Sequence, residues 1–72
     1  MFIVKFFDKD GSYTAFSCLS YRVLPPKDGP ASIQLFGVGN ETQCDPIPIE
    51  DKAIIENEKG TTVDVIRAKR GG

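Results

Sequence analysis

The chain has 72 residues, of which 40% are hydrophobic and 26% are charged, a composition that predicts one globular domain and excludes both a multidomain and a disordered protein. Nine lysines and arginines against ten aspartates and glutamates leave a net charge of −1, which excludes a general nucleic-acid or membrane binder. The sequence contains neither histidine nor tryptophan, so the residue that is both the commonest general base and the commonest metal ligand is missing.

The first 24 residues have the composition of two β-strands joined by a tight turn. Phe2, Val4 and Phe6 alternate with the side chains between them, which predicts a strand over residues 1–7. The next four residues read Asp-Lys-Asp-Gly, a turn sequence in which the glycine can take a positive φ. Residues 12–24 contain no glycine or proline. We expect a long second strand that bends there, because neither of its faces is cleanly polar.

Proline and glycine divide the middle of the chain. Residues 25–30 include three prolines, which cannot join a central strand. Residues 31–38 are predicted to form a third strand, which ends where two glycines and an asparagine favour a turn. Residues 42–49 are predicted to form an edge strand, because Pro46 and Pro48 have no N–H group to donate to a neighbouring strand.

The last third of the chain predicts a hairpin. Residues 53–57 and 61–68 have the alternation of paired strands, and Gly60 lies in the turn between them. We expect Val63 and Val65 to point inward, toward the core.

The predicted fold class is all-β, because no window of the sequence carries an apolar stripe at helical spacing. We expect a five- or six-stranded antiparallel meander, curled into a small-barrel-like or half-open sheet, with at most a 3₁₀ turn near residues 49–53. Residues 1–68 are predicted to form a single β domain. Residues 69–72 are predicted to be a flexible C-terminal tail, because they hold no apolar side chain to bury.

The two cysteines, Cys18 and Cys44, bear on the compartment of the protein. The apolar opening over residues 1–7 is too short for a signal peptide and is interrupted by Lys5. No apolar run approaches the ~20 residues of a membrane-spanning helix. We therefore expect a cytoplasmic protein with reduced thiols, although a disulfide between the two cysteines stays open.

The sequence predicts no enzyme. Cys18 has no histidine to activate it, and two cysteines without histidine do not make a zinc site. Residues 8–11 begin like a calcium loop, but Leu19 stands where the closing glutamate is required. We expect no catalytic, cofactor-binding or metal-binding residue, no cofactor and no small-molecule substrate.

Charge is concentrated in residues 41–58, which hold six acidic residues and one lysine, a net charge of −5. Prolines mark part of this segment as an exposed edge, so its carboxylates can meet the lysines and arginines of a partner. The predicted partner-binding residues are Asp45, Glu50, Asp51, Glu56 and Glu58.

Single-stranded nucleic acid is the alternative ligand. Aromatic residues on a curved strand, with cations nearby, can form a stacking platform of the kind that small β-barrels use. The same aromatic residues are also needed to fill the core of so short a chain, which makes direct nucleic-acid binding the less favoured hypothesis. The alternative nucleic-acid-binding residues are Tyr13, Tyr21, Arg22, Arg67, Lys69 and Arg70.

The two ends of the chain resemble those of ubiquitin-like modifiers. Residues 70–72 read Arg-Gly-Gly, and residues 1–7 are similar to the opening strand of that family. The resemblance implies a C-terminal carboxylate that is activated and joined to lysine. A ubiquitin-like fold also needs a long amphipathic helix after the first hairpin, where this chain has the proline-rich residues 25–30.

A second resemblance covers more of the chain. The opening Phe-Ile-Val-Lys-Phe-Phe, the proline-broken middle and the closing residues 48–67 look like the small orphan proteins of bacteriophages and prophages, anti-CRISPR proteins among them. The resemblance implies a phage-encoded, non-enzymatic inhibitor in the host cytoplasm. Such a protein would bind a host protein or ribonucleoprotein and block a CRISPR-type defence complex by occupying its basic nucleic-acid-binding surface.

Overall fold

The computed structural model describes residues 1–25 and 30–68, which form eight strands and no helix. The strands are β1 (Phe2–Phe7), β2 (Tyr13–Cys18), β3 (Ser20–Leu24), β4 (Ser32–Val38), β5 (Glu41–Gln43), β6 (Ile47–Pro48), β7 (Lys52–Glu56) and β8 (Thr62–Arg67). All pairings between them are antiparallel. The predicted all-β, antiparallel fold is confirmed. The predicted tail, residues 69–72, lies outside the described residues.

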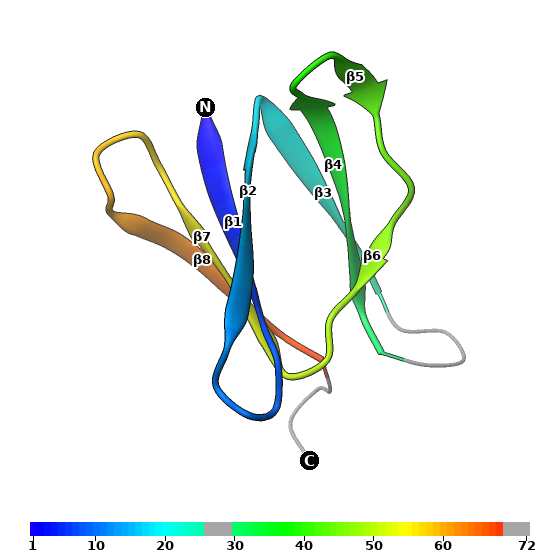
Figure 1. Ribbon diagram of the computed structural model, residues 1–72, viewed down its shortest axis with the longest axis vertical. Coiled ribbons are helices and arrows are strands. Elements are labelled where there is room, and N and C mark those ends of the chain that lie inside the picture. The colour runs from blue at the N-terminus through cyan, green and yellow to red at the C-terminus, as the bar shows by residue number, and fades with distance from the viewer. Residues whose placement is uncertain (26–29, 69–72) are drawn as a thin grey trace.

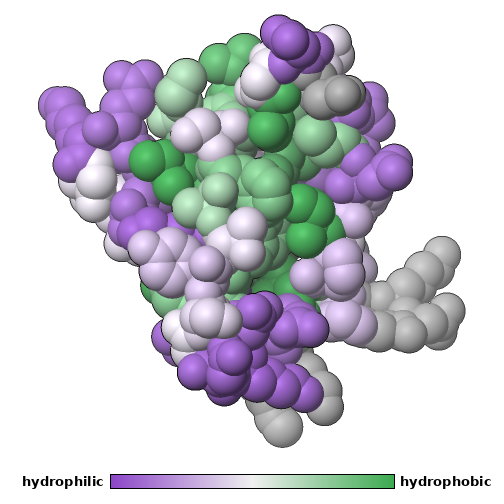
Figure 2. Space-filling view, in the orientation of Figure 1, coloured by the Kyte–Doolittle hydropathy of each residue, from purple (hydrophilic) through white to green (hydrophobic). Residues whose placement is uncertain are grey.

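The strands form two four-stranded sheets. Sheet A has the order β2-β1-β7-β8, and sheet B places β3 on one side of β4 and both β5 and β6 on the other. Figure 1 shows the two sheets side by side, joined at the top by the bend between β2 and β3 and converging again at the lower end, where β8 and β6 end; they do not close into a barrel. Figure 2 shows hydrophobic side chains over the middle of the same face and hydrophilic ones over the β1–β2 turn at its lower end.

The predicted long strand bends at Leu19 and divides between the sheets. Residues before this point pair with β1 as β2, and residues after it pair with β4 as β3. The N–H of Leu19 donates to the carbonyl oxygen of Phe36 at 2.9 Å, which ties the bend to β4. Two of the six expected strands divide in this way, and the total is therefore eight.

The predicted edge strand over residues 42–49 is the second one that divides. Its first part, β5, pairs with the end of β4, where Gln43 is opposite Phe36. Its last part, β6, pairs with the start of β4, where Ile47 is opposite Ile33. Between them the N–H of Cys44 donates to the carbonyl of Leu35 at 3.1 Å. Pro46 then interrupts the ladder, because proline has no N–H group to donate.

The core lies between the two sheets and is built almost entirely from aliphatic side chains. Burying a Val, Leu, Ile or Phe side chain contributes about 1.5–3 kcal/mol, and among the described residues no polar or charged residue is buried. The buried residues are Val4, Phe6, Cys18, Ala31, Ile33, Leu35, Ile49, Ala53, Ile55 and Ala68.

The prediction that Val63 and Val65 point inward is wrong. They are 46% and 45% exposed, and Ile66 is the residue of β8 that packs against the core. Ile66 pairs with the buried Ala53, so the residues on either side of it in β8 face outward. A bulge between Ile55 and the next residue of β7 shifts the register near Val63.

A series of backbone hydrogen bonds joins the two sheets where they converge. The N–H of Asp51 donates to the carbonyl oxygen of Phe7 at 3.3 Å, and the N–H of Ala68 donates to the backbone carbonyl oxygen of Asp51 at 3.0 Å. The N–H of Ala31 then donates to the carbonyl oxygen of Ala68 at 3.2 Å, and the N–H of Ile49 donates to the carbonyl oxygen of Ala31 at 2.9 Å. We call these five residues the junction. It links the ends of β1 and β8 in sheet A to the segments that flank β4 and β6 in sheet B.

Gly37→Ala is expected to destabilise the protein by about 2–4 kcal/mol, the sum of a strained backbone and an overpacked contact. Gly37 has a φ of 74°, and an added Cβ would lie 2.7 Å from Cγ of Leu19. Gly39→Ala is the matched control, because Gly39 has a φ of 58° but nothing within 4 Å; it should cost only about 1 kcal/mol. Urea unfolding measures the free energy of unfolding of both variants. Equal losses of stability in the two variants would contradict a steric role for Leu19.

Candidate functional site

The fold brings two acidic segments from distant parts of the sequence to one end of sheet A. Asp8 and Asp10 lie in the turn between β1 and β2, and Glu50 and Asp51 form the corner between β6 and β7. The hydrogen bond from the N–H of Asp51 to the carbonyl of Phe7 holds the corner against the end of β1. We call these four carboxylates the acidic end.

The β1–β2 turn holds its aspartates in place through Ser12. The hydroxyl of Ser12 lies 2.7 Å from Oδ1 of Asp10 and 3.1 Å from Oδ2 of Asp8, and its N–H donates to Oδ1 of Asp10 at 2.9 Å. These hydrogen bonds from Ser12 lower the pKa of Asp10 below its ordinary value. Asp10 therefore stays ionised to a lower pH than a free aspartate does.

The neighbours of Glu50 shift its pKa in the opposite direction, upward. A side-chain hydrogen bond with Asp8, followed by the negative charge of Asp8, raises the pKa of Glu50 above its ordinary value of 4.5, and Lys9 acts in the other direction. The side chain is exposed, so the hydrogen bond with Asp8 and the charge of Asp8, rather than burial, are the main causes of the raised pKa. The fold thus places the carboxyl groups of Glu50 and Asp8 close to each other.

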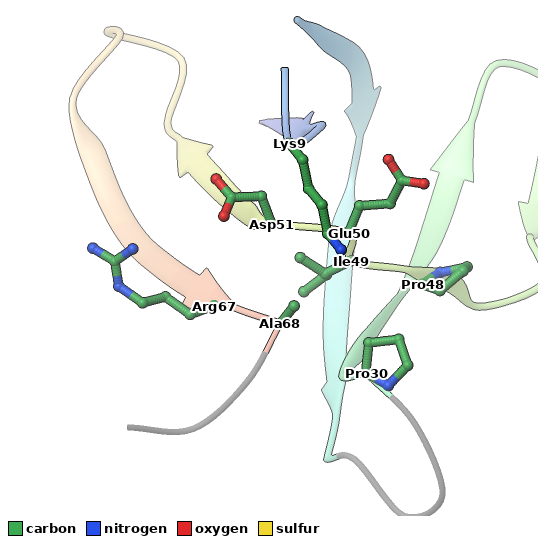
Figure 3. A pocket seen from close by; sticks show the side chains of 8 residues that line it. All are labelled: Lys9, Pro30, Pro48, Ile49, Glu50, Asp51, Arg67 and Ala68. Carbon is green, nitrogen blue, oxygen red and sulfur yellow. The ribbon is translucent and has the colours of Figure 1, made fainter. Parts of the chain in front are cut away.

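A hollow of about 850 Å³ lies beside the acidic end. Figure 3 shows Lys9 extending toward the Glu50 corner, while the side chain of Arg67 points away from the other labelled residues. The charges around the hollow are two cations and two carboxylates, which balance, so they favour no ligand of either sign. The residues that line it are Lys9, Pro30, Pro48, Ile49, Glu50, Asp51, Arg67 and Ala68.

Of the five predicted partner-binding residues, only Glu50 and Asp51 lie at the acidic end, and Figure 3 shows their side chains pointing apart. Glu56 is at the far end of β7, where its Oε2 lies 3.2 Å from Nζ of Lys5 in a half-buried ion pair. Glu58 is in the β7–β8 turn, with its Oε1 3.0 Å from the amino group of Met1. Asp45 is exposed in the segment between β5 and β6 of sheet B.

The alternative nucleic-acid-binding residues are also divided. Tyr13 and Arg67 lie on the outer face of sheet A, at opposite ends of one row that crosses its four strands. Tyr21 lies at the border of the core, with its ring edge-on to that of Phe2 at 5.3 Å. Arg22 is exposed and pairs with Gln34 on the outer face of sheet B. The remaining two, Lys69 and Arg70, lie outside the described residues.

Sequence reasoning missed Asp8 and Asp10 as members of the site. The predicted turn places both at the tip of the first hairpin, and this signal was available in the sequence. The pairing of β1 with β7, which brings residue 50 near residue 8, joins residues that are 45 to 53 positions apart along the chain. No local pattern specifies such a pairing.

The remaining sites for chemistry are few. Cys18 and Cys44 are free thiols, and burial raises the pKa of Cys18, which makes its reactive thiolate scarcer at neutral pH. Within residues 1–25 and 30–68, no group of three or more aspartate, glutamate or cysteine side chains could hold a metal ion. In the same ranges, no helix is long and apolar enough to cross a membrane.

No protein-family profile, curated protein or solved structure matches the chain. Function is therefore inferred from the geometry and chemistry of the described residues.

Glu50→Gln is expected to raise the melting temperature slightly at pH 7, because it removes a repulsive charge and keeps a group that can hydrogen-bond to Asp8. The gain should shrink as the pH falls toward 4.5. A raised pKa means that the folded wild type binds a proton more readily than the unfolded chain, so the wild type gains stability on acidification. Thermal unfolding at the two pH values measures the difference.

Glu58→Gln is the matched control for this prediction. This variant removes the same charge, but in the wild type the carboxylate of Glu58 pairs with the amino group of Met1 rather than lying near another carboxylate. This variant should be no more stable than the wild type at pH 7. A Glu50→Gln variant that unfolds at a lower temperature than the wild type at pH 7 would contradict the repulsion.

Proposed function

We propose that the protein is a non-enzymatic inhibitor that binds a basic surface of a partner protein through its acidic end. The observation that carries the proposal is the position of Glu50 beside the first hairpin turn, where the N–H of Asp51 donates to the carbonyl oxygen of Phe7 at 3.3 Å and Asp8 raises the pKa of Glu50. Arrangements that cost stability are concentrated at functional sites, because the function is what maintains them. A cationic partner would remove the repulsion and so gain binding energy from it.

The partner that best fits is a protein that normally binds nucleic acid. Lysines and arginines that hold phosphates are spaced to meet a series of negative charges. The acidic end holds four carboxylates in two adjacent loops, and Figure 3 shows those of Glu50 and Asp51 pointing to different sides. Occupying such a surface would exclude the nucleic acid from it. This mode of action agrees with the phage-type resemblance, in which a small protein blocks a CRISPR-type complex of the host.

Two ion pairs within the chain favour Glu50 and Asp51 over Glu56 and Glu58 as the contact residues of this proposal. Glu56 and Glu58 are each paired with a cation of the same chain, so a partner would have to break those ion pairs before it could use them. Glu50 and Asp51 have no such pairing within the part of the chain that the structure describes. The acidic end therefore replaces the whole 41–58 segment as the proposed contact.

The test is capture of partners from a bacterial lysate by three immobilised proteins: the wild type, the E50Q/D51N variant and the D45N/E58Q variant. The two variants carry the same change in net charge. A nucleic-acid-binding protein captured by the wild type should be retained by D45N/E58Q and bind about tenfold more weakly to E50Q/D51N, with release as salt rises.

The purified partner then provides the second measurement. The wild-type protein should displace the partner's nucleic acid, and E50Q/D51N should do so about tenfold less well. Capture of the same proteins by all three baits, or displacement that is insensitive to Glu50 and Asp51, would refute the role of the acidic end.

A further inference from the structure

The outer face of sheet A carries a row of two aromatic rings and two cations. Tyr13 of β2 pairs with Phe7 of β1, Phe7 pairs with Lys52 of β7, and Lys52 pairs with Arg67 of β8. Adjacent strands lie about 4.8 Å apart, so the row extends over about 14 Å. It lies on the face opposite the core, because Phe6 and Ala53, the chain neighbours of Phe7 and Lys52, are buried.

The rings and cations of this row are arranged for stacking. The centroids of Phe7 and Tyr13 are 5.0 Å apart, with 34° between the ring planes. Nζ of Lys52 lies 5.4 Å from the centroid of Phe7, and Nζ of Lys5, from the next row, lies 5.5 Å from that of Tyr13. Tyr13 is 53% exposed, so part of its ring surface is open to a ligand.

The charges of Lys52 and Arg67 on this face are not neutralised by a carboxylate of the same face. Glu56 is on the same face, and it pairs with Lys5. Within residues 1–25 and 30–68, neither Lys52 nor Arg67 forms an ion pair. The face therefore has a local net charge of +2, although the whole chain carries −1. An anionic ligand fits it.

We propose that this face binds single-stranded nucleic acid, with a base stacked on Tyr13 and phosphates at Lys52 and Arg67. Every base has a face that can stack on an aromatic ring, and its phosphates lie close enough to meet neighbouring cations. Exposed aromatic residues on a four-stranded sheet can bind single strands in this way. This site goes beyond the proposed inhibitor function and uses other residues.

Two other anionic partners fit the face less well. A lipid surface requires several apolar side chains that protrude past the cations. This face offers Val65, which is 45% exposed, and Ile54, which is only half-exposed between Lys5 and Val65. An acidic peptide would satisfy the cations and leave the open ring of Tyr13 without a group to stack on it. Both partners are distinguished from nucleic acid by the experiment.

The acidic end adjoins this row, since Asp8 follows Phe7 and Asp51 precedes Lys52 in the chain. Its carboxylates repel phosphates and so weaken the binding of a nucleic-acid strand. Neutralising them in E50Q/D51N should therefore strengthen the binding of an oligonucleotide about two- to threefold, while the same variant binds a basic partner less well. The two proposals thus predict opposite effects of one variant.

The experiment is fluorescence anisotropy with a labelled single-stranded oligonucleotide of about 12 nucleotides, as DNA and as RNA, at low salt. Tyr13→Ala should weaken binding about 5- to 100-fold, whereas Tyr13→Phe, which keeps the ring, should bind like the wild type. The K52Q/R67Q variant should weaken binding and lower the slope of log affinity against log salt by about 1.4.

The matched control is R22Q/K59Q, which removes two positive charges from the outer face of sheet B and the β7–β8 turn. It should bind the oligonucleotide like the wild type, and circular dichroism should show that every variant is folded. Three results would overturn the proposal: no binding at low salt by micromolar wild type, equal losses in R22Q/K59Q and K52Q/R67Q, or stronger binding to anionic-lipid vesicles or poly-glutamate than to the oligonucleotide.

The outcomes also separate this site from the acidic end. If the wild-type protein does not bind the oligonucleotide, but its capture of a partner protein still depends on Glu50 and Asp51, only the stacking-site proposal is refuted. Binding that depends on Tyr13, with capture insensitive to Glu50 and Asp51, would overturn the acidic-end proposal alone.

Discussion

The junction is the constraint on which the rest of this structure depends. Four backbone hydrogen bonds join the end of β1, the β6–β7 corner, the end of β8 and the start of β4 in one series. Ala31 and Ala68 are both buried there, and larger side chains at these positions would keep the two sheets apart. Backbone groups buried without partners cost free energy, so this series also satisfies polar groups at the point where the sheets converge. It holds Glu50 and Asp51 beside the first hairpin turn, and the acidic end exists for that reason.

Sheet A divides opposite charges between two neighbouring surfaces. Its outer face carries Lys52 and Arg67 beside the rings of Phe7 and Tyr13, while the carboxylates gather in the loops at one end of the same strands. The net charge of −1 for the whole chain conceals this separation. A surface potential depends on local arrangement rather than on the total, and a protein with almost no net charge can therefore present both an acidic and a basic binding surface.

The β8 edge of sheet A has two features that oppose pairing with other chains. The N–H of Val65 in the edge strand β8 donates to Oδ1 of Asp64 at 2.9 Å, so one edge amide is already satisfied by a side chain. The bulge in the β7–β8 ladder further disturbs the edge. Charged side chains and bulges of this kind prevent edge-to-edge association in β-proteins.

Local physical chemistry was enough for the sequence by itself to determine the fold class and most strand positions. Alternation, glycine turns and the missing N–H of Pro46 act over a few residues, so a bend somewhere within residues 12–24 and the edge position of residues 42–49 could be predicted. The exposure of Glu50 and Asp51 followed in the same way. Only the tertiary structure decided that β1 pairs with β7, because no local signal links residues that are 45 to 53 positions apart along the chain. That pairing places Phe7 beside Lys52 and Asp8 beside Glu50, and the register of β7 with β8 turns Val65 outward. Both proposed sites therefore depend on long-range packing, and the sequence determined only which residues were available to build them.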